Sequence, residues 1–368
     1  MMVKIIPQRG LESLPTYRPG RQIEEIQRKY GITDVIKLSS NENPLGVSPK
    51  AVEALENMLS KVNFYPDGQS ITLRNSLAKH LHVLPEQVMV GNGEDGLILE
   101  ICLAFLDENS EAIVSCSSFP IYDIYIRTMR AKLVKTPLHE FRLNLQAMAD
   151  AVTDRTKVIF VCNPNNPTGT TITAADAAAF LVRIPDNVLV IFDEAYFEFV
   201  DTDNFPDTIQ YVNEGRENIL VLRTFSKIYG LAGLRLGYAI GAPSILSALN
   251  KVKEPFSVNL LAQTAGLAVL EDHEFRQKTF QITQEGRKYL YQEFDRLDLN
   301  YVKSQTNFIM TEIGPRANEV IEKMTRKGVV IRPCSAYDLP YFARISIGTP
   351  EQNARLVKTL EEVLNAIN

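Results

Sequence analysis

Seven short apolar runs alternate with segments of helical period between residues 87 and 240, and few folds accommodate that order. Such uninterrupted apolar runs are typical of strands that helices cover on both faces. The intervening segments Leu97–Phe105 and Ala174–Val182 have the length and period of crossover helices. The sequence therefore predicts an open, mostly parallel α/β sheet. Its expected strands are Gln87–Val90, Ala112–Cys116, Lys132–Lys135, Lys157–Cys162, Val188–Phe192, Ile219–Leu222 and Leu236–Ile240.

A second, smaller α/β domain is expected after Pro255, where the pattern changes. Long helical segments are followed by short strands, and Thr349-Pro350-Glu351-Gln352 has the signature of a helix start. We divide the chain into an arm (1–36) that packs on the small domain or on a dimer partner, a large domain (37–255) that contains the open sheet, and a small domain (256–368). The later elements expected are helices Arg21–Tyr30, Leu260–Leu270, Phe275–Leu297, Ala317–Lys327 and Glu351–Ala366, and strands Asn307–Thr311, Val329–Arg332 and Ala343–Ile347.

Composition argues against several classes of protein. The 368 residues have a formal net charge of -5, which gives no electrostatic reason to expect nucleic acid or an anionic membrane as partner. No apolar run reaches the roughly 20 residues of a membrane helix, and the first residues lack the apolar core of a signal peptide. The four cysteines are scattered and none has metal-ligand spacing. We expect a reduced, cytoplasmic protein without a metal.

Ligands of open α/β sheets bind beyond the carboxyl ends of the strands. After the first strand comes Gly91-Asn92-Gly93-Glu94-Asp95-Gly96, whose backbone N–H groups at a helix start suit an anion. A plain tight turn and a dinucleotide site are the alternatives, but the next strand ends in Cys116-Ser117-Ser118, without the acid that holds a ribose. We expect the Glu94 and Asp95 side chains to point away or to accept hydrogen bonds from backbone amides.

Three further strand ends carry polar or aromatic residues. Phe119 could stack on a planar ligand or be ordinary core, and the amides of Asn163–Gly169, Asn166 among them, are more numerous than a turn needs. Asp193 directly follows a buried strand, where a carboxylate is costly unless it is paired. Because no cluster of histidines or acids accompanies it, we expect it to hold a protonated cation, with Tyr196 as a second contact.

The next expected strand, Ile219–Leu222, is followed by Lys227 in a turn that is rich in hydroxyls and glycines. A lysine in a partly dry pocket loses its proton readily and becomes a carbonyl nucleophile, although an ordinary surface lysine is the alternative. Thr224, Ser226 and Arg235 could hold a phosphate. A reactive amine, the carboxylate of Asp193 and an anion cradle at one edge together meet the requirements of pyridoxal 5′-phosphate.

With these features in place, the chain resembles the fold-type I, class I/II pyridoxal-phosphate aminotransferases, and within them most closely the branch that acts on histidinol phosphate. The matching segments follow the order of the family and span nearly the whole chain. They are Ser40–Gly46, Tyr65–Gly68, Asn163–Gly169, Asp193–Tyr196, Thr224–Lys227, Ala232–Gly237 and Arg344–Gly348.

The resemblance implies a role for each residue at the cofactor. Lys227 would carry pyridoxal phosphate as a Schiff base and move protons during catalysis, and Asp193 would pair with the ring nitrogen. Tyr196 and Asn166 would contact O3′, with Phe119 over the ring. The remaining cofactor residues would bind the phosphate: Gly93, Glu94 and Asp95 through their backbone, Thr224, Ser226 and Arg235, and Tyr65 from the other subunit of a homodimer whose active site is shared.

For the substrate, the resemblance implies that Arg344 binds an anionic group and that Arg332 adds a second guanidinium group, with Tyr17 and Asn43 nearby. The implied reaction transfers the amino group of L-histidinol phosphate to 2-oxoglutarate, in histidine biosynthesis. The alternatives are a phenylalanine or tyrosine aminotransferase, a phosphothreonine decarboxylase, a non-catalytic cofactor-binding protein and a nicotinamide dehydrogenase. The sequence departs from the family pattern at Glu94-Asp95-Gly96 and at Asp338, where glycine is common.

Overall fold

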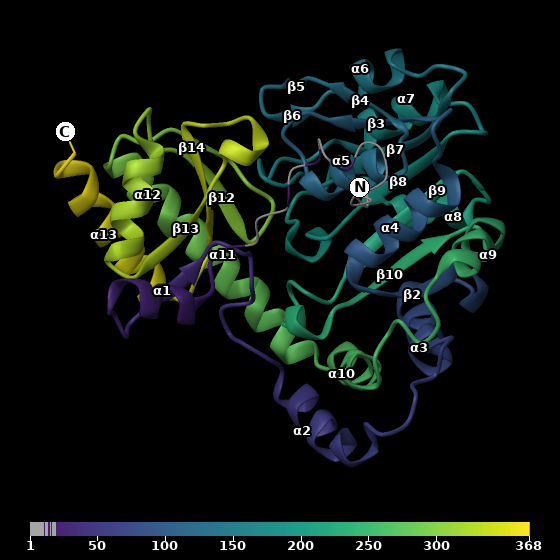
Figure 1. The fold of residues 1–368 in the computed structure, drawn as a ribbon, viewed down its shortest axis with the longest axis horizontal. Helices are drawn as coiled ribbons and strands as arrows, with labels where there is room; N and C mark the ends of the chain where they lie inside the picture. Colours follow the sequence, from purple (N-terminus) through teal and green to yellow (C-terminus); the bar gives the residue numbers. More distant parts are fainter. Residues whose placement is uncertain (1–10, 12–13, 15, 17–19, 368) are drawn as a thin grey trace, which may run out of the picture.

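The structure is a computed structural model that describes residues 11, 14, 16 and 20–367. Two bodies, each built on its own sheet, lie side by side (Figure 1). A seven-stranded sheet forms the centre of the larger body, on the right of the figure, and a five-stranded sheet that of the smaller one. In the part of the chain that is described, no helix is both long and apolar enough to cross a membrane.

The large sheet has the order β2-β10-β9-β8-β7-β3-β4. The five strands from β9 to β4 are parallel, whereas β10 is antiparallel to both of its neighbours. The sheet is thus mostly parallel, as the apolar runs predicted. The bounds are β2 (Val88–Asn92), β10 (Leu236–Gly241), β9 (Ile219–Thr224), β8 (Leu189–Asp193), β7 (Thr156–Cys162), β3 (Glu111–Ser115) and β4 (Lys132–Thr136).

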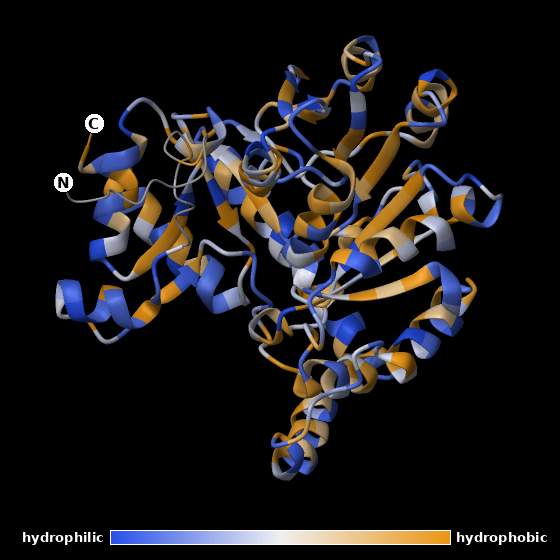
Figure 2. Cartoon of the chain, turned by 45° about the vertical axis from the view of Figure 1, so that its right-hand side comes forward, coloured by the Kyte–Doolittle hydropathy of each residue, from blue (hydrophilic) through white to orange (hydrophobic). Residues whose placement is uncertain are grey.

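Helices cover both faces of this sheet because its strands are apolar on both. These helices form two groups, one on each face of the sheet. In β8, Val190 and Phe192 pack with the first group, whereas Leu189 and Ile191 pack with the second. Figure 2 shows the central strands as hydrophobic ribbons beneath more hydrophilic helices and loops. The first group is α2 (Pro49–Met58), α3 (Ile71–Leu81), α6 (Leu145–Asp150), α7 (Ala174–Arg183), α8 (Thr208–Asn213) and α10 (Leu260–Leu270), and the second is α4 (Gly93–Phe105), α5 (Pro120–Thr128) and α9 (Pro243–Val252).

The smaller sheet has the order β1-β13-β14-β12-β11 and packs on helices from the end of the chain. Its strand β1 comes from the start of the chain and pairs parallel with β13. The bounds are β1 (Ile36–Leu38), β13 (Val329–Pro333), β14 (Phe342–Ser346), β12 (Phe308–Glu312) and β11 (Tyr301–Val302), with α1 (Ile23–Tyr30), α11 (His273–Arg296), α12 (Ala317–Arg326) and α13 (Pro350–Asn365). In the arm, the Tyr30 hydroxyl donates to Glu322 of α12 over 2.6 Å.

The bounds of the expected elements match the structure to within a few residues. Several very short strands of the structure were not predicted. The strands β1 and β11 and the hairpin of β5 (Leu138–His139) and β6 (Arg142–Leu143) were not expected. The helix α10 lies beyond the predicted start of the small domain, yet it packs on α2 and contributes Ala262 and Val269 to the core of the large sheet. We propose that the two domains divide between α10 and α11.

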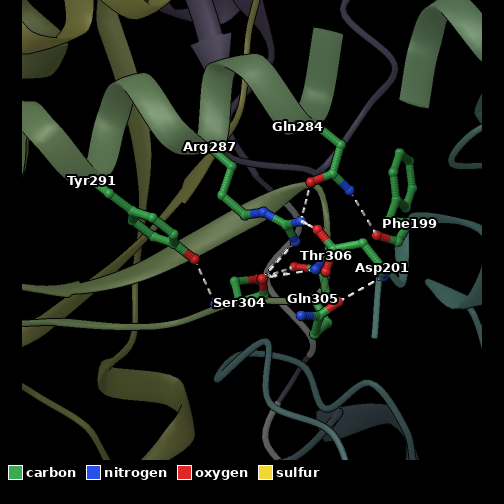
Figure 3. A network of polar contacts seen from close by, with 8 residues as sticks. All are labelled: Phe199, Asp201, Gln284, Arg287, Tyr291, Ser304, Gln305 and Thr306. Atoms are coloured by element: carbon green, nitrogen blue, oxygen red, sulfur yellow. Dashed lines mark hydrogen bonds and ion pairs between the residues drawn. The ribbon is translucent and has the colours of Figure 1, made fainter. Parts of the chain in front are cut away.

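A polar network at Arg287 joins α11 to the larger body (Figure 3). The buried guanidinium group donates to the carbonyl of Ser304 and to the carboxylate of Asp201, each over 2.5 Å. Gln284, one helical turn earlier, donates to the carbonyl of Phe199 over 3.3 Å. Charge-assisted bonds in a buried position are among the stronger polar contacts. They fix the long helix against the segment that follows β8.

We expect Thr349→Ala to lower the free energy of unfolding by about 1 kcal/mol. The Thr349 hydroxyl accepts from Gln352 N over 3.3 Å, and the Gln352 side chain accepts from Thr349 N over 3.0 Å, so the predicted cap of α13 is formed. Urea unfolding measures the change. Thr349→Ser, which keeps the hydroxyl, should retain most of the stability, and an equal loss in both variants would contradict the role of the cap.

Candidate active site

One cavity of about 350 Å³ opens at the carboxyl edge of the large sheet and faces the smaller body. The ends of β7, β8 and β9 are in register there, since Cys162 pairs with Asp193 and Asp193 with Leu222. The lining includes eleven predicted site residues: Glu94, Asp95, Phe119, Asn166, Asp193, Tyr196, Thr224, Ser226, Lys227, Arg332 and Arg344. The fold therefore gathers residues that lie up to 250 positions apart in the sequence.

Lys227 lies in the turn after β9, in the wall of this cavity. Its ammonium nitrogen is 5.5 Å from the centroid of the Tyr196 ring. Burial, helped by the positive charge of Arg344, lowers the pKa of Lys227 to about 8. The amine is therefore neutral in a far larger fraction of molecules near neutral pH than an ordinary lysine is, which favours its action as a nucleophile or a general base.

Asp193 ends β8 and is buried on the floor of the site. Its carboxylate accepts hydrogen bonds from the hydroxyl of Tyr122 and from the N–H of Ala195. Sequence reasoning missed Tyr122, which lies one turn along α5 from the predicted Phe119. Both donors are neutral, so the negative charge of Asp193 is left for a protonated ligand nitrogen.

Glu94, in the first turn of α4, is where the expectation from sequence was wrong. Its side chain does not point away from the site: it is buried, lines the cavity, and its Oε1 has no hydrogen-bond partner. Burial and the neighbouring charge of Asp193 raise the pKa of Glu94 well above its usual range. Asp95, which also lines the cavity, pairs with the guanidinium group of Arg235 at 3.1 Å.

The start of α4 has the geometry of an anion site. Gly93 has φ +70°, and a Cβ there would come within 2.8 Å of Arg235 Nη2, so glycine leaves room for the guanidinium group over the helix end. The Thr224 hydroxyl donates to Ser226 Oγ over 3.0 Å at the neighbouring strand end. Backbone N–H groups at a helix start, two hydroxyls and a guanidinium group suit a phosphate.

The phenol of Tyr196 and the amide of Asn166 face the cavity from the ends of two parallel strands. Asn41 Nδ2 donates to the Tyr196 hydroxyl over 2.9 Å. Burial raises the pKa of Tyr196 far above its usual range, so the phenol keeps a proton that it can donate. The amide oxygen of Asn163 instead accepts from Ile172 N within its own loop, and Asn165 Nδ2 donates to Thr168 Oγ1 and to the carbonyl of Ser117 in the loop after β3.

Arg344 connects the smaller body to the cavity. It donates to Asn166 Oδ1 over 2.5 Å, to the Tyr337 hydroxyl over 3.2 Å and to the carbonyl of Ser39 over 2.9 Å. Its register partner on β13 is Arg332, which also lines the cavity. Two guanidinium groups on neighbouring strands thus face Lys227 from across the site.

Three residues singled out from the sequence lie elsewhere, and a fourth is not described. Asn43 binds the carbonyl of Ile228 and the hydroxyl of Thr279, while its neighbour Asn41 lines the cavity. Tyr65 is 83% exposed on the surface. Asp338 is exposed and not part of the lining, and its φ of +61° is the left-handed conformation that glycine favours and aspartate tolerates. Tyr17 lies outside the described residues.

The dinucleotide site, an alternative from the sequence, can be compared with this geometry. The loop Gly91–Gly96 follows β2, an edge strand that pairs antiparallel with β10, and β3 lies on the far side of the sheet. A dinucleotide-binding unit instead has its glycine loop between neighbouring parallel strands. Among the described residues, no group of three or more histidines, cysteines or acids could hold a metal ion.

Comparison with known proteins assigns the family. A profile of "Aminotransferase class I and II" matches residues 33–360. The chain belongs to this aminotransferase family. Relatives include the histidinol-phosphate aminotransferase of Moorella thermoacetica, 44% identical over 96% of this chain and 91% of the relative, and histidinol-phosphate aminotransferase 2 of Carboxydothermus hydrogenoformans, 41% identical over 98% and 99%.

The fold of this aminotransferase agrees with that assignment. The crystal structure of histidinol-phosphate aminotransferase from Sinorhizobium meliloti, in complex with pyridoxal-5′-phosphate, superposes with a TM-score of 0.92. Its sequence identity is 25%, and the match covers the whole of both chains. The fold-type I class expected from the sequence is confirmed, and the protein is an enzyme.

In the cofactor-free enzyme, we expect the amine of Lys227 to react with an acylating reagent at a rate that is half-maximal near pH 8, since its pKa is lowered from 10.5 to about 8. Mass spectrometry of the Lys227 peptide across a pH series measures that rate. Arg344→Gln removes one of the charges responsible and should move the midpoint to higher pH. A wild-type midpoint near 10.5 would contradict the desolvated environment.

Proposed function

We propose that this enzyme transfers the amino group of L-histidinol phosphate to 2-oxoglutarate, giving imidazole-acetol phosphate and glutamate, with pyridoxal 5′-phosphate as cofactor. The observation that carries the proposal is the pair Arg332 and Arg344, which face Lys227 across one cavity. Relatives named histidinol-phosphate aminotransferase align with almost the whole chain, which supports this choice of substrate.

The residues present fit the proposed cofactor at each of its polar groups. Lys227 would bind the aldehyde carbon, Asp193 the ring nitrogen, and Tyr196 with Asn166 the O3′ oxygen. Phe119 lines the same cavity and would cover the ring. The space that Gly93 leaves beneath Arg235, together with Thr224 and Ser226, would take the phosphate.

When bound, the cofactor supplies an electron sink for the substrate carbon that bears the amino group. Lys227 Nζ accepts the proton from that carbon and returns a proton at the former aldehyde carbon, as general base and then acid. Its lowered pKa suits both tasks because the two protonation states are then close in free energy. Asp193 keeps a proton on the ring nitrogen, which maintains the electron demand.

Arg332 and Arg344 would bind the phosphate of histidinol phosphate and, in the second half-reaction, a carboxylate of 2-oxoglutarate. Guanidinium groups bind such anions in bidentate geometry. A phenylalanine or tyrosine aminotransferase would use the same machinery for a substrate that needs one guanidinium group. A panel of histidinol phosphate, phenylalanine and phosphothreonine, assayed with 2-oxoglutarate, decides among the three substrate classes, and carbon dioxide release would reveal a decarboxylase.

We expect Arg332→Ala to reduce kcat/KM for histidinol phosphate by about 10- to 100-fold, because a charge-assisted contact is worth roughly 1.5–3 kcal/mol. Turnover of phenylalanine should change far less. Steady-state kinetics on both substrates measures the ratio. Lys227→Ala, the control for the chemistry, should be inactive on every substrate and lack the visible absorbance of covalently bound cofactor. Equal losses on both substrates in Arg332→Ala would contradict the phosphate role.

We also propose that the enzyme works in the cytoplasm as a homodimer that shares its active sites. The helix α2 and the loop after it protrude at the bottom of Figure 1, and this segment carries several exposed apolar side chains. Tyr65 stacks on Phe256 there, with the ring centroids 4.8 Å apart, and both rings are solvent-exposed in the single chain. A second copy would cover them, and Tyr65 would then reach the partner's cofactor phosphate. Other exposed members of this face are Val52, Leu59, Val62, Phe64 and Ile71.

Subunit mixing tests the shared site. We expect Tyr65→Ala and Lys227→Ala homodimers each to have low activity. Mixed dimers should regain activity, because one of their two sites combines an intact Lys227 with an intact partner Tyr65. Activity after refolding a mixture, compared with each variant refolded alone, is the measurement. No recovery in a mixture shown by native mass spectrometry to contain mixed dimers would contradict a shared site.

A further inference from the structure

Glu94 has a side chain that the role proposed for its backbone does not need. Any small residue could offer a backbone N–H to a phosphate at the start of α4. Glu94 instead brings a carboxyl group into the cavity, where it is about nine-tenths buried and its Oε1 lacks a hydrogen-bond partner. An unsatisfied buried polar atom is costly and calls for an explanation.

The carboxyl groups of Glu94 and Asp193 interact within the same cavity, close enough for a hydrogen bond between their side chains. Two buried carboxylates in contact cannot both be ionised, so a proton must lie between them. Asp193 already accepts from the Tyr122 hydroxyl and the N–H of Ala195, which stabilise its ionised form. Glu94 has no such donor. The proton therefore belongs to Glu94, which acts as donor, and Asp193 as acceptor.

We propose that Glu94 is a positioning residue: as a carboxylic acid it donates a hydrogen bond to Asp193 and holds that carboxylate toward the ring nitrogen of the cofactor. This inference rests on the proposed cofactor function of the site. It assigns the Glu94 side chain to the ring-nitrogen end, in addition to the backbone contact with the phosphate. The acid form of Glu94 is then the form that binds the cofactor.

Charge around Glu94 makes its proton state and cofactor binding depend on each other. Burial and Asp193 raise its pKa well above the usual range, and the positive charge of Lys227 opposes them. A phosphate bound at the same turn of α4 would add negative charge and favour the neutral acid further. Loss of the proton as pH rises should therefore weaken cofactor binding. The titratable groups that face Glu94 are Asp193, Asp95, Lys227, Tyr122 and Cys162.

The test measures the dissociation constant of pyridoxamine 5′-phosphate, which has no aldehyde and so does not react with Lys227. Wild type and Glu94→Gln are compared from about pH 6 to about pH 9; the amide mimics the protonated acid and still donates to Asp193. We expect equal affinity at the low end. The ratio of the wild-type to the variant dissociation constant should then rise, by up to about tenfold per pH unit, once Glu94 ionises in the free enzyme.

Glu100→Gln is the matched control, because Glu100 lies on the same helix, is also buried, and has a pKa raised by burial to about 7, yet does not line the cavity. Its ratio to wild type should not change with pH. A flat ratio for Glu94→Gln, or weak binding by that variant at every pH, would overturn the inference.

Calorimetry of the wild type and of Glu94→Gln in two buffers gives a second test. The ring nitrogen of pyridoxamine phosphate contributes equally in both proteins, so binding at alkaline pH should take up more protons in the wild type, and equal uptake would overturn the proposal. A wild type that does not bind pyridoxamine phosphate at any pH would instead refute the proposed function itself. The two failures are therefore distinguishable.

Discussion

The structure depends on the desolvation of ionisable groups at the ends of buried strands. Asp193 ends one strand that is apolar on both faces and Lys227 follows another, so each lies in the site with little water around it. Burial raises the pKa of Asp193 and lowers the pKa of Lys227 to about 8, because in both residues it disfavours the charged form. A parallel sheet brings these ends to one edge, and that edge is where a ligand with complementary charges is most strongly favoured.

Desolvation also affects a pair of charged side chains that lie further from the cavity. Glu194, next to Asp193 in sequence, points to the opposite side and pairs with the buried Arg223 at 2.8 Å. The ring of Phe197 lies 3.6 Å from that guanidinium group, and the Thr208 hydroxyl donates to Glu194 over 2.6 Å. Removing one member of a buried pair typically costs about 3–5 kcal/mol. The pair helps to anchor the end of β8, and therefore Asp193, against the turn that bears Lys227.

Much of this was readable from the sequence because it depends on local pattern. The long apolar runs gave the strands of the large sheet, and their following residues gave Lys227, Asp193 and Tyr196. Pairings of two or three residues, such as β1 with β13, leave too short a pattern to read. The direction of side chains in loops was also not readable: φ of +56° at Asn41 turns the chain so that Asn41, and not Asn43, faces the cavity. At Glu94, solvation of a carboxylate suggested an outward side chain, and the three-dimensional contact with Asp193 outweighed it.

The guanidinium group of Arg344 donates hydrogen bonds to Asn166, to Tyr337 and to the carbonyl of Ser39. On the function proposed above, an anion that binds Arg344 would compete with these oxygens, and its full negative charge would favour it over a neutral molecule of similar shape. Asn166 also lines the cavity in which the O3′ oxygen is proposed to lie. An anion that displaced Asn166 from Arg344 would therefore change the hydrogen bonds of an amide beside the cofactor, and one hydrogen bond would link the two binding sites.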